Sequence, residues 1–114
     1  AGCTIALGTD NVMINSPDMF REMDYLWKVS MGTQKKRLSP KHILKMATVN
    51  AANVLQNKKI GTIQPRNLAD CIFIDKHAID LEPMHNPHAS IVHRASENVV
   101  KAVMIGGKIV YGKI

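Results

Sequence analysis

A chain of 114 residues, 46% of them hydrophobic, is long enough to form one domain with a packed core, which excludes a disordered protein. Its formal net charge of +6 raises the question of a nucleic-acid partner. Apart from a cluster at 35–37, however, the lysines and arginines are spread along the chain, and no aromatic residues alternate with them to stack on bases. The charge pattern therefore favours a solvated basic face and no nucleic-acid partner.

The cysteines and the hydrophobic segments bear on the cellular compartment. Cys3 and Cys71 both lie in apolar runs, which is typical of reduced, buried thiols. No stretch reaches the length of a membrane-spanning helix, and no signal peptide is recognisable. These features predict a cytoplasmic protein without a membrane partner. The chain begins at Ala1 directly on a predicted strand, which indicates a piece of a longer protein.

The first half of the chain predicts one strand and two helices. Residues 3–9 have the length and the apolar continuity of a buried parallel strand. The triplet Ser16-Pro17-Asp18 offers an N-cap, a first-turn proline and an early acid, and it predicts a helix over 17–31. Ser39-Pro40 repeats this cap, and apolar residues at three- and four-residue spacing predict a second helix that ends near Gln56.

In the second half the pattern changes to that of β-structure. Residues 71–74 predict a short strand that is buried on both faces. Residues 76–90, with two prolines and three of the five histidines, predict an ordered loop. Two closing strands, 99–105 and 108–111, are joined by Gly106-Gly107, a pair typical of a two-residue hairpin turn. Because three such segments make a thin sheet, the predicted α/β arrangement is incomplete.

Four stretches, taken in order, are similar to stretches of a known family. The sequence "LGTDN" followed by "SPDMFREM" resembles the last barrel strand and the next helix of the amidohydrolase superfamily. The branch of this superfamily that the chain resembles contains chlorohydrolases and the cytosine, guanine and adenosine-type deaminases. The stretches "ILKMATVNAANVL", "IGTIQPRNLADCIFID" and "NVVKAVMIGGKIVYG" resemble the helix and the closing strands that follow in that family. The resemblance covers nearly the whole chain.

This resemblance implies both a fold and a chemistry. The implied fold is α/β, with the last strand and helices of a metal-dependent (β/α)8 barrel at residues 1–59 and part of a small β-sandwich at 60–114. The implied activity is hydrolysis of a carbon–nitrogen bond outside peptides, by deamination of a small heterocyclic substrate, with hydrolytic dechlorination of such a ring as the alternative. The implied cofactor is a divalent metal, zinc in the first place and iron or manganese as alternatives. By the same resemblance, the other metal ligands would be histidines upstream of this chain, which would then be a C-terminal fragment.

Asp10 is the residue to which the resemblance assigns the chemistry. A carboxylate at the C-terminal end of a barrel strand faces the mouth where catalytic groups gather. By resemblance, Asp10 binds the metal and carries a proton from water to the leaving group. The alternative is that Asp10 only caps the loop after the strand. Because a catalytic metal needs three or more protein ligands, the chain on its own is expected to be inactive.

The residues after Asp10 depart from the family pattern. Asn11 stands where the family often has glycine, and asparagine tolerates the left-handed backbone that would keep such a turn. Its side chain could instead bind the substrate, and both interpretations stay open. The stretch after Asn11 is also one residue shorter than the common family pattern. This difference argues against the substrate specificity of a standard nucleoside deaminase. Asn15 either matches an asparagine of that pattern or caps the next helix.

Two further hypotheses compete with this assignment. His85 and His88 have ligand-like spacing, but Pro87 and the absence of cysteine or acidic partners favour a solvated loop over a metal site. The whole chain could also be a self-contained basic binding module without catalysis, in which case its affinity for oligonucleotides would fall with salt. Open edges of the strand predicted at 3–9 favour self-association into a homo-oligomer.

Overall fold

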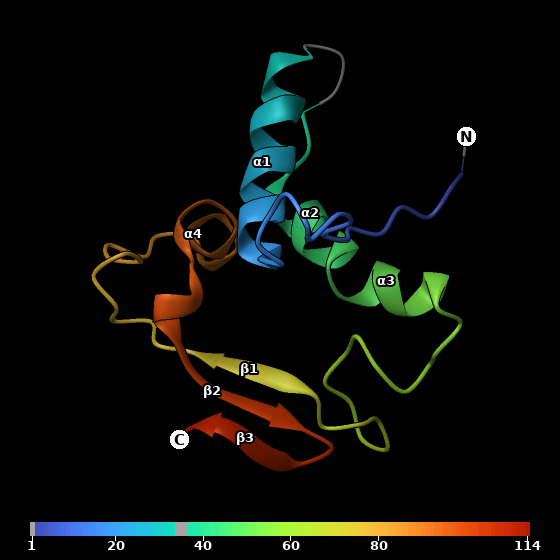
Figure 1. Ribbon diagram of the computed structural model, residues 1–114, viewed down its shortest axis with the longest axis vertical. Coiled ribbons are helices and arrows are strands. Elements are labelled where there is room, and N and C mark those ends of the chain that lie inside the picture. The colour runs from blue at the N-terminus through green and yellow to red at the C-terminus, as the bar shows by residue number, and fades with distance from the viewer. Residues whose placement is uncertain (1, 34–36) are drawn as a thin grey trace.

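The computed structural model describes residues 2–33 and 37–114. Ala1, and Lys35 and Lys36 of the basic cluster, lie outside these described residues. Figure 1 shows a layer of helices above a three-stranded sheet. The helices are α1 (Met19–Gly32), α2 (Pro40–Met46), α3 (Val49–Val54) and α4 (Pro87–Arg94), and the strands are β1 (Cys71–Ile74), β2 (Val100–Ile105) and β3 (Lys108–Gly112). No helix in the described part of the chain is both long and apolar enough to cross a membrane.

Helix α1 confirms the first predicted helix but not its predicted cap. The Asp18 carboxylate accepts hydrogen bonds from the backbone N–H groups of Phe20 (2.9 Å) and Arg21 (3.4 Å), so Asp18 is the N-cap. Ser16, the predicted cap, instead accepts a bond from the Asp18 N–H through its carbonyl (2.8 Å). The chain turns there before the helix begins, and the helix therefore starts two residues later than expected.

The second predicted helix starts as expected at Ser39 and Pro40 but is broken into α2 and α3. The Leu7 N–H donates to the Met46 carbonyl at 3.0 Å. In a continuous helix that carbonyl would accept from the residue four positions on, so Leu7 takes the bond that would carry α2 forward. The Thr48 hydroxyl also donates back to the Leu44 carbonyl (2.7 Å). The prediction of one helix to residue 56 is therefore wrong.

The sheet confirms the three strands predicted in the second half. It is antiparallel in the order β1-β2-β3, and Ile72, Val103 and Tyr111 lie opposite one another across it. Gly106 (φ 56°) and Gly107 (φ 79°) make the turn between β2 and β3, both in the left-handed region. The short helix η1 (Glu97–Val99) leads into β2. One oxygen of the Asp70 carboxylate accepts from the Gly106 N–H at 2.6 Å and fixes the turn.

Two other predictions about secondary structure are wrong. Residues 3–9 form no strand, because the neighbours they meet are α2 and α3 rather than another strand. Part of the loop predicted at 76–90 is helical, since α4 begins at Pro87 after the N-cap Asn86, whose side chain accepts from the Ala89 N–H at 3.1 Å.

The core lies inside the helical layer. Met23, Ile43 and Val92, from α1, α2 and α4, are buried together. The partly buried residues packed on them are Leu7, Phe20, Leu26, Trp27, Leu38, Leu44, Ala47 and Ile91. Both cysteines are free thiols, as predicted, but Cys3 is exposed and Cys71 only half-buried. The prediction that both are buried is wrong, because Cys3 lies in the segment 3–9 on the surface of the helical layer and Cys71 lies in β1, which is only partly covered.

Candidate functional site

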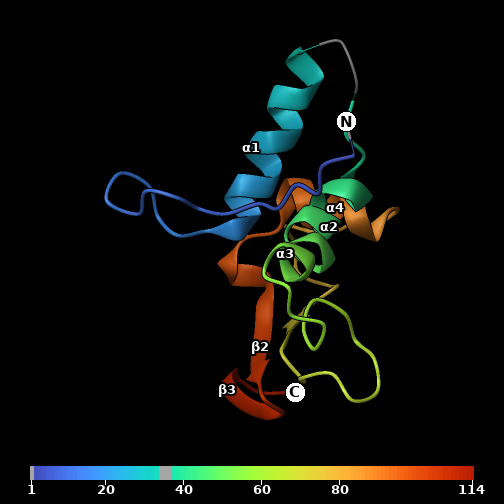
Figure 2. The ribbon, with the colours of Figure 1, turned by 90° about the vertical axis from the view of Figure 1, so that its right-hand side faces the viewer.

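The segment that ends at Asp10 is fixed to the helical layer at two places. The Leu7 N–H bonds to α2 at the Met46 carbonyl, and the side-chain amide of Asn50 in α3 donates to the Ile5 carbonyl at 3.1 Å. The Leu7 side chain also packs on the buried core. Figure 2 shows this segment crossing the helices and then forming a loop that projects beyond them before α1 begins. Asp10 lies three residues past the Leu7 anchor, at the start of this loop.

Asp10 has a backbone conformation that is uncommon for a non-glycine residue. Its φ is 47°, in the left-handed region that Asp and Asn tolerate better than most residues. The sequence left this conformation open for Asn11, whereas in the structure it occurs at Asp10. The Asp10 side chain is exposed, and no hydrogen bond to its carboxylate occurs within residues 2–33 and 37–114. The carboxylate is therefore accessible to a ligand.

Asn11 builds the turn that follows. Its side-chain oxygen accepts from the Met13 N–H at 3.0 Å, and its carbonyl accepts from the N–H groups of Ile14 and Asn15, each at 3.3 Å. This arrangement is an Asx turn, the local role that asparagine commonly has in loops. Asn15 does not cap α1, since Asp18 does so.

The described residues do not form a metal site by themselves. No group of three or more His, Cys, Asp or Glu side chains that could hold a metal ion is found among them. Asp10 is thus one candidate ligand without partners in this part of the chain. His85 and His88, the pair with ligand-like spacing, are both exposed.

His93 in α4 is a residue whose surroundings the sequence did not predict. Its ring lies 4.1 Å from the Trp27 ring, between centroids, and its Nδ1 is buried without a hydrogen-bond partner in the described structure. The nearest carboxylate oxygen, on Asp24, is 4.0 Å away. Burial lowers the pKa of His93 below 6.5, the Asp24 carboxylate raises it in part, and Lys28 lowers it further. His93 thus links α4 to α1 and takes no part in the Asp10 loop.

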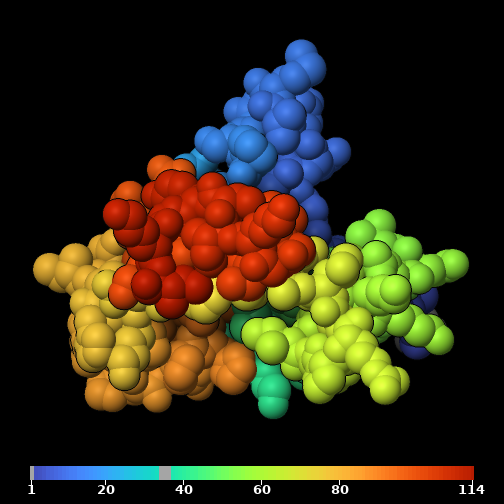
Figure 3. Space-filling model, turned by 90° about the horizontal axis from the view of Figure 1, so that it is seen from below, coloured from blue at the N-terminus to red at the C-terminus, as the bar shows by residue number. Residues whose placement is uncertain are grey.

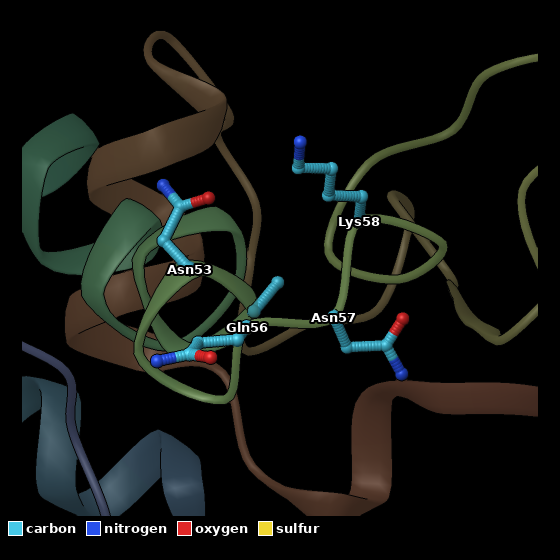
Figure 4. A pocket seen from close by; sticks show the side chains of 5 residues that line it. Asn53, Gln56, Asn57 and Lys58 are labelled. Atoms are coloured by element: carbon cyan, nitrogen blue, oxygen red, sulfur yellow. The ribbon is translucent and has the colours of Figure 1, made fainter.

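An apolar groove of about 1230 Å³ lies between the helices and the sheet. Its walls include Phe20 and Leu44 of the helical layer, and Ile72 and Tyr111 of the sheet. Figure 3, a view from below, shows the sheet in front with the N-terminal loop projecting past it. A second hollow, of about 380 Å³, lies at the end of α3. Figure 4 shows that the side chains of Asn53, Gln56, Asn57 and Lys58 around it point in different directions, so they do not converge on a ligand.

Comparison with known proteins identifies the family to which this chain belongs. The chain belongs to the amidohydrolase family, whose family model matches residues 1–110. It is 35% identical to a 5'-deoxyadenosine deaminase of Methanopyrus kandleri, over 96% of this chain and 26% of that protein. It is 37% identical to a 5-methylthioadenosine/S-adenosylhomocysteine deaminase of Pelotomaculum thermopropionicum, over 99% of this chain and 27% of that protein.

Solved structures agree with this assignment. An adenosine deaminase from Xanthomonas campestris with bound zinc matches at a TM-score of 0.89 and 26% identity, over 96% of this chain and 26% of that one. An atrazine chlorohydrolase from Arthrobacter aurescens, complexed with zinc, has the same fold at a TM-score of 0.80, over 97% of this chain and 26% of that one. The chain thus spans about a quarter of the length of these relatives.

Proposed function

We propose that this chain contributes Asp10 to the active site of a metal-dependent hydrolase that acts on carbon–nitrogen bonds of a heterocyclic ring. In this proposal residues 1–59 occupy the last strand and helix positions of a (β/α)8 barrel, and residues 60–114 belong to a small β-sandwich. The observation that carries it is the Asp10 carboxylate, which is exposed and without a hydrogen bond in the described structure, at the end of a segment fixed to α2 and α3. Membership of the amidohydrolase family supports the choice of reaction.

The reaction that fits best is hydrolytic deamination. Relatives that cover most of this chain are named as deaminases of 5'-deoxyadenosine and of 5-methylthioadenosine/S-adenosylhomocysteine. Dechlorination is the second choice, supported by fold alone through the atrazine chlorohydrolase.

Asp10 has two roles in this proposal, as a metal ligand and as a proton carrier. A divalent metal, zinc in the first place and iron or manganese as alternatives, would lower the pKa of a water molecule toward neutrality. The Asp10 carboxylate would accept the proton that this water loses and would later hand it to the leaving group. The exposed position of Asp10 suits both transfers, because a carboxylate already engaged by backbone N–H groups would be a weaker proton acceptor. Asn11 would orient the loop and offer its amide to the substrate.

The site would be completed by residues outside this chain. One carboxylate does not hold a catalytic metal, and the described residues offer no further cluster of ligands. We therefore expect the 114-residue chain alone to release no ammonia from any purine, pyrimidine or triazine. We also expect the complete protein to be a homo-oligomer.

The test is the substitution Asp10→Asn in the complete protein, with Asp80→Asn as the matched control on an exposed loop. We expect Asp10→Asn to lower kcat for deamination of a heterocyclic amine by about a thousandfold or more, because general acid–base catalysis alone contributes ~10²–10⁴-fold. Bound zinc, measured by elemental analysis, should fall as well, while Asp80→Asn leaves both unchanged. Full activity of Asp10→Asn would contradict the proposal. Binding of oligonucleotides by the 114-residue chain, with a steep salt dependence, would favour the basic binding module instead.

A further inference from the structure

The break between α2 and α3 offers one acceptor and one donor to the segment that leads to Asp10. The Met46 carbonyl accepts from the Leu7 N–H at 3.0 Å, and the side-chain amide of Asn50 donates to the Ile5 carbonyl at 3.1 Å. Figure 1 shows the N-terminal segment passing beside these two helices. Asn50 and Ile5 are 45 residues apart in the sequence, so one side chain joins two distant parts of the chain.

The two bonds have the pattern of a parallel β-ladder. In such a ladder, one residue donates its N–H to a carbonyl of the neighbouring strand and accepts, at its own carbonyl, from the N–H two residues further on. Here the Asn50 amide is the donor and the Met46 carbonyl is the acceptor. Their partners, Ile5 and Leu7, are two residues apart. The α2–α3 break therefore takes the place of a neighbouring strand for this apolar segment.

These two bonds determine how the segment approaches Asp10. In the described part of the chain, the backbone of residues 3–10 makes no other hydrogen bond. Gly8 has open space beside it, since a Cβ there would meet no atom within 4 Å. One bond at Leu7 fixes a point about which the segment can pivot, and the packing of the Leu7 side chain fixes the same point. The second bond, at Ile5, fixes the direction in which the segment continues toward Asp10.

We infer that Asn50 is a positioning residue for the proposed reaction. Its amide donates to the Ile5 carbonyl and so directs the segment that carries the Asp10 carboxylate toward the metal and its water. Asn50 acts through the backbone and does not touch the substrate. Alignment of this kind matters for catalysis, because a displacement of about 1 Å can cost about a hundredfold in rate. The inference rests on the proposed function of Asp10 and adds a residue to that same site.

The test is the substitution Asn50→Asp in the complete protein. The bond at Leu7 joins two backbone groups, so a side-chain substitution removes only the bond at Ile5. Aspartate keeps the size of asparagine, but its carboxylate cannot donate a hydrogen bond to the Ile5 carbonyl. We expect kcat to fall about ten- to a hundredfold. KM should change less than about twofold, because the interaction that is lost is not one with the bound substrate.

Two further variants separate loss of the hydrogen bond from other effects of the substitution. Asn53→Asp places the same charge three residues further along α3, on an exposed side chain, and should leave kcat and KM unchanged. Asn50→Ala removes the donor without adding a charge and should lower kcat about tenfold. Circular dichroism checks that all variants fold.

Zinc affinity, measured by competition with a chelator, gives a readout that does not depend on turnover. Asn50→Asp should weaken zinc binding about tenfold when Asp10 is present, as loss of a residue that orients a metal ligand commonly does. In the Asp10→Asn background the same substitution should change zinc affinity less than about twofold, because the ligand that Asn50 positions is then absent. A general loss of stability would instead lower the affinity equally in both backgrounds.

Unchanged kcat and zinc affinity in Asn50→Asp and Asn50→Ala, with Asp10→Asn inactive, would overturn the inference and leave the proposed function standing. An equal loss of zinc affinity in both backgrounds would overturn it too, because Asn50 would then act without Asp10. So would an equal fall in kcat for Asn53→Asp, which would attribute the effect to charge. Full activity of Asp10→Asn would overturn the proposed function itself, and the inference with it.

Discussion

Two short apolar runs of this chain have the same sequence character and different structures. Residues 3–9 and residues 71–74 are both apolar and both end beside an aspartate, Asp10 and Asp75. The second run is β1 and pairs along its length with β2. The first run forms no strand, and its backbone is bonded to helices α2 and α3 instead.

The difference shows what an apolar run does and does not specify. Such a run predicts partial burial, whereas a strand also needs a neighbouring backbone with free N–H and C=O groups. β1 finds that neighbour in β2. The run at 3–9 finds the end of α2, where one helical carbonyl is open to Leu7, and this bond helps to end the helix. For residues 3–9 the apolar pattern therefore predicts neither the partner nor the full burial.

The largest expected change in stability comes from placing a charge beside the second run, and it is compared with a charge placed within the first run. Ala102 of β2 lies opposite Phe73 and is fully buried, so Ala102→Asp should lower the free energy of unfolding by about 3 kcal/mol or more. Ala6→Asp in the first run, which is only half-buried, should cost about 1 kcal/mol. Urea unfolding followed by circular dichroism measures both. Equal costs would contradict the difference in burial between the position opposite Phe73 and the first run.

A smaller effect is expected at the anchor of the first run. Leu7 packs on the core, so Leu7→Ala should cost about 1 kcal/mol of unfolding free energy, less than a fully buried leucine would. Ile5→Ala, two residues earlier and 59% exposed, is the matched control and should change it by less than about 0.5 kcal/mol. The same urea experiment measures both variants. A larger cost for Ile5→Ala would contradict the anchoring role of Leu7.

Elements with strong local signals could be predicted from the sequence. The Ser39-Pro40 start of α2, the β2–β3 hairpin at Gly106-Gly107 and the extent of β1 are confirmed because cap and turn chemistry is local. Helix α4 carries the same signal at Asn86-Pro87, although the histidines and prolines around it are typical of a loop. The break between α2 and α3 could not be predicted, since it involves Leu7 from a distant part of the chain.

The candidate site was predictable only in part. Asp10 was singled out by resemblance to a family, and membership of that family is confirmed, while its roles stay a prediction. The hydrogen bonds of Asn11 follow the ordinary chemistry of asparagine in turns, but its side chain alone did not tell which residue is left-handed. The contact of His93 with Trp27 depends on how α4 packs against α1, which no local pattern contains.

Lowering the pH has the smallest expected effect on stability. It should act on the helical layer and not on the sheet. Strands β1, β2 and β3 contain no histidine, whereas the helical layer that holds residues 3–9 contains His93. The folded pKa of His93 is lowered below its ordinary 6.5, first by burial and also by Lys28, so the unfolded chain binds the proton more tightly. The stability that this histidine contributes is therefore complete above pH 6.5 and is lost as the pH falls through the lowered folded pKa. The effect is small because solvent reaches about a quarter of the side chain.

Trp27, the single tryptophan, gives a local signal for this titration. Its fluorescence should change as neighbouring His93 gains a proton, at a pH below 6.5, while amide exchange in β2 stays unchanged over the same range. Asp24→Asn should move the fluorescence midpoint to still lower pH, because the Asp24 carboxylate raises the pKa. His93→Phe keeps a ring beside Trp27 and should abolish the transition. A transition that survives in His93→Phe, or that accompanies loss of the sheet, would contradict the separate acid response of the helical layer.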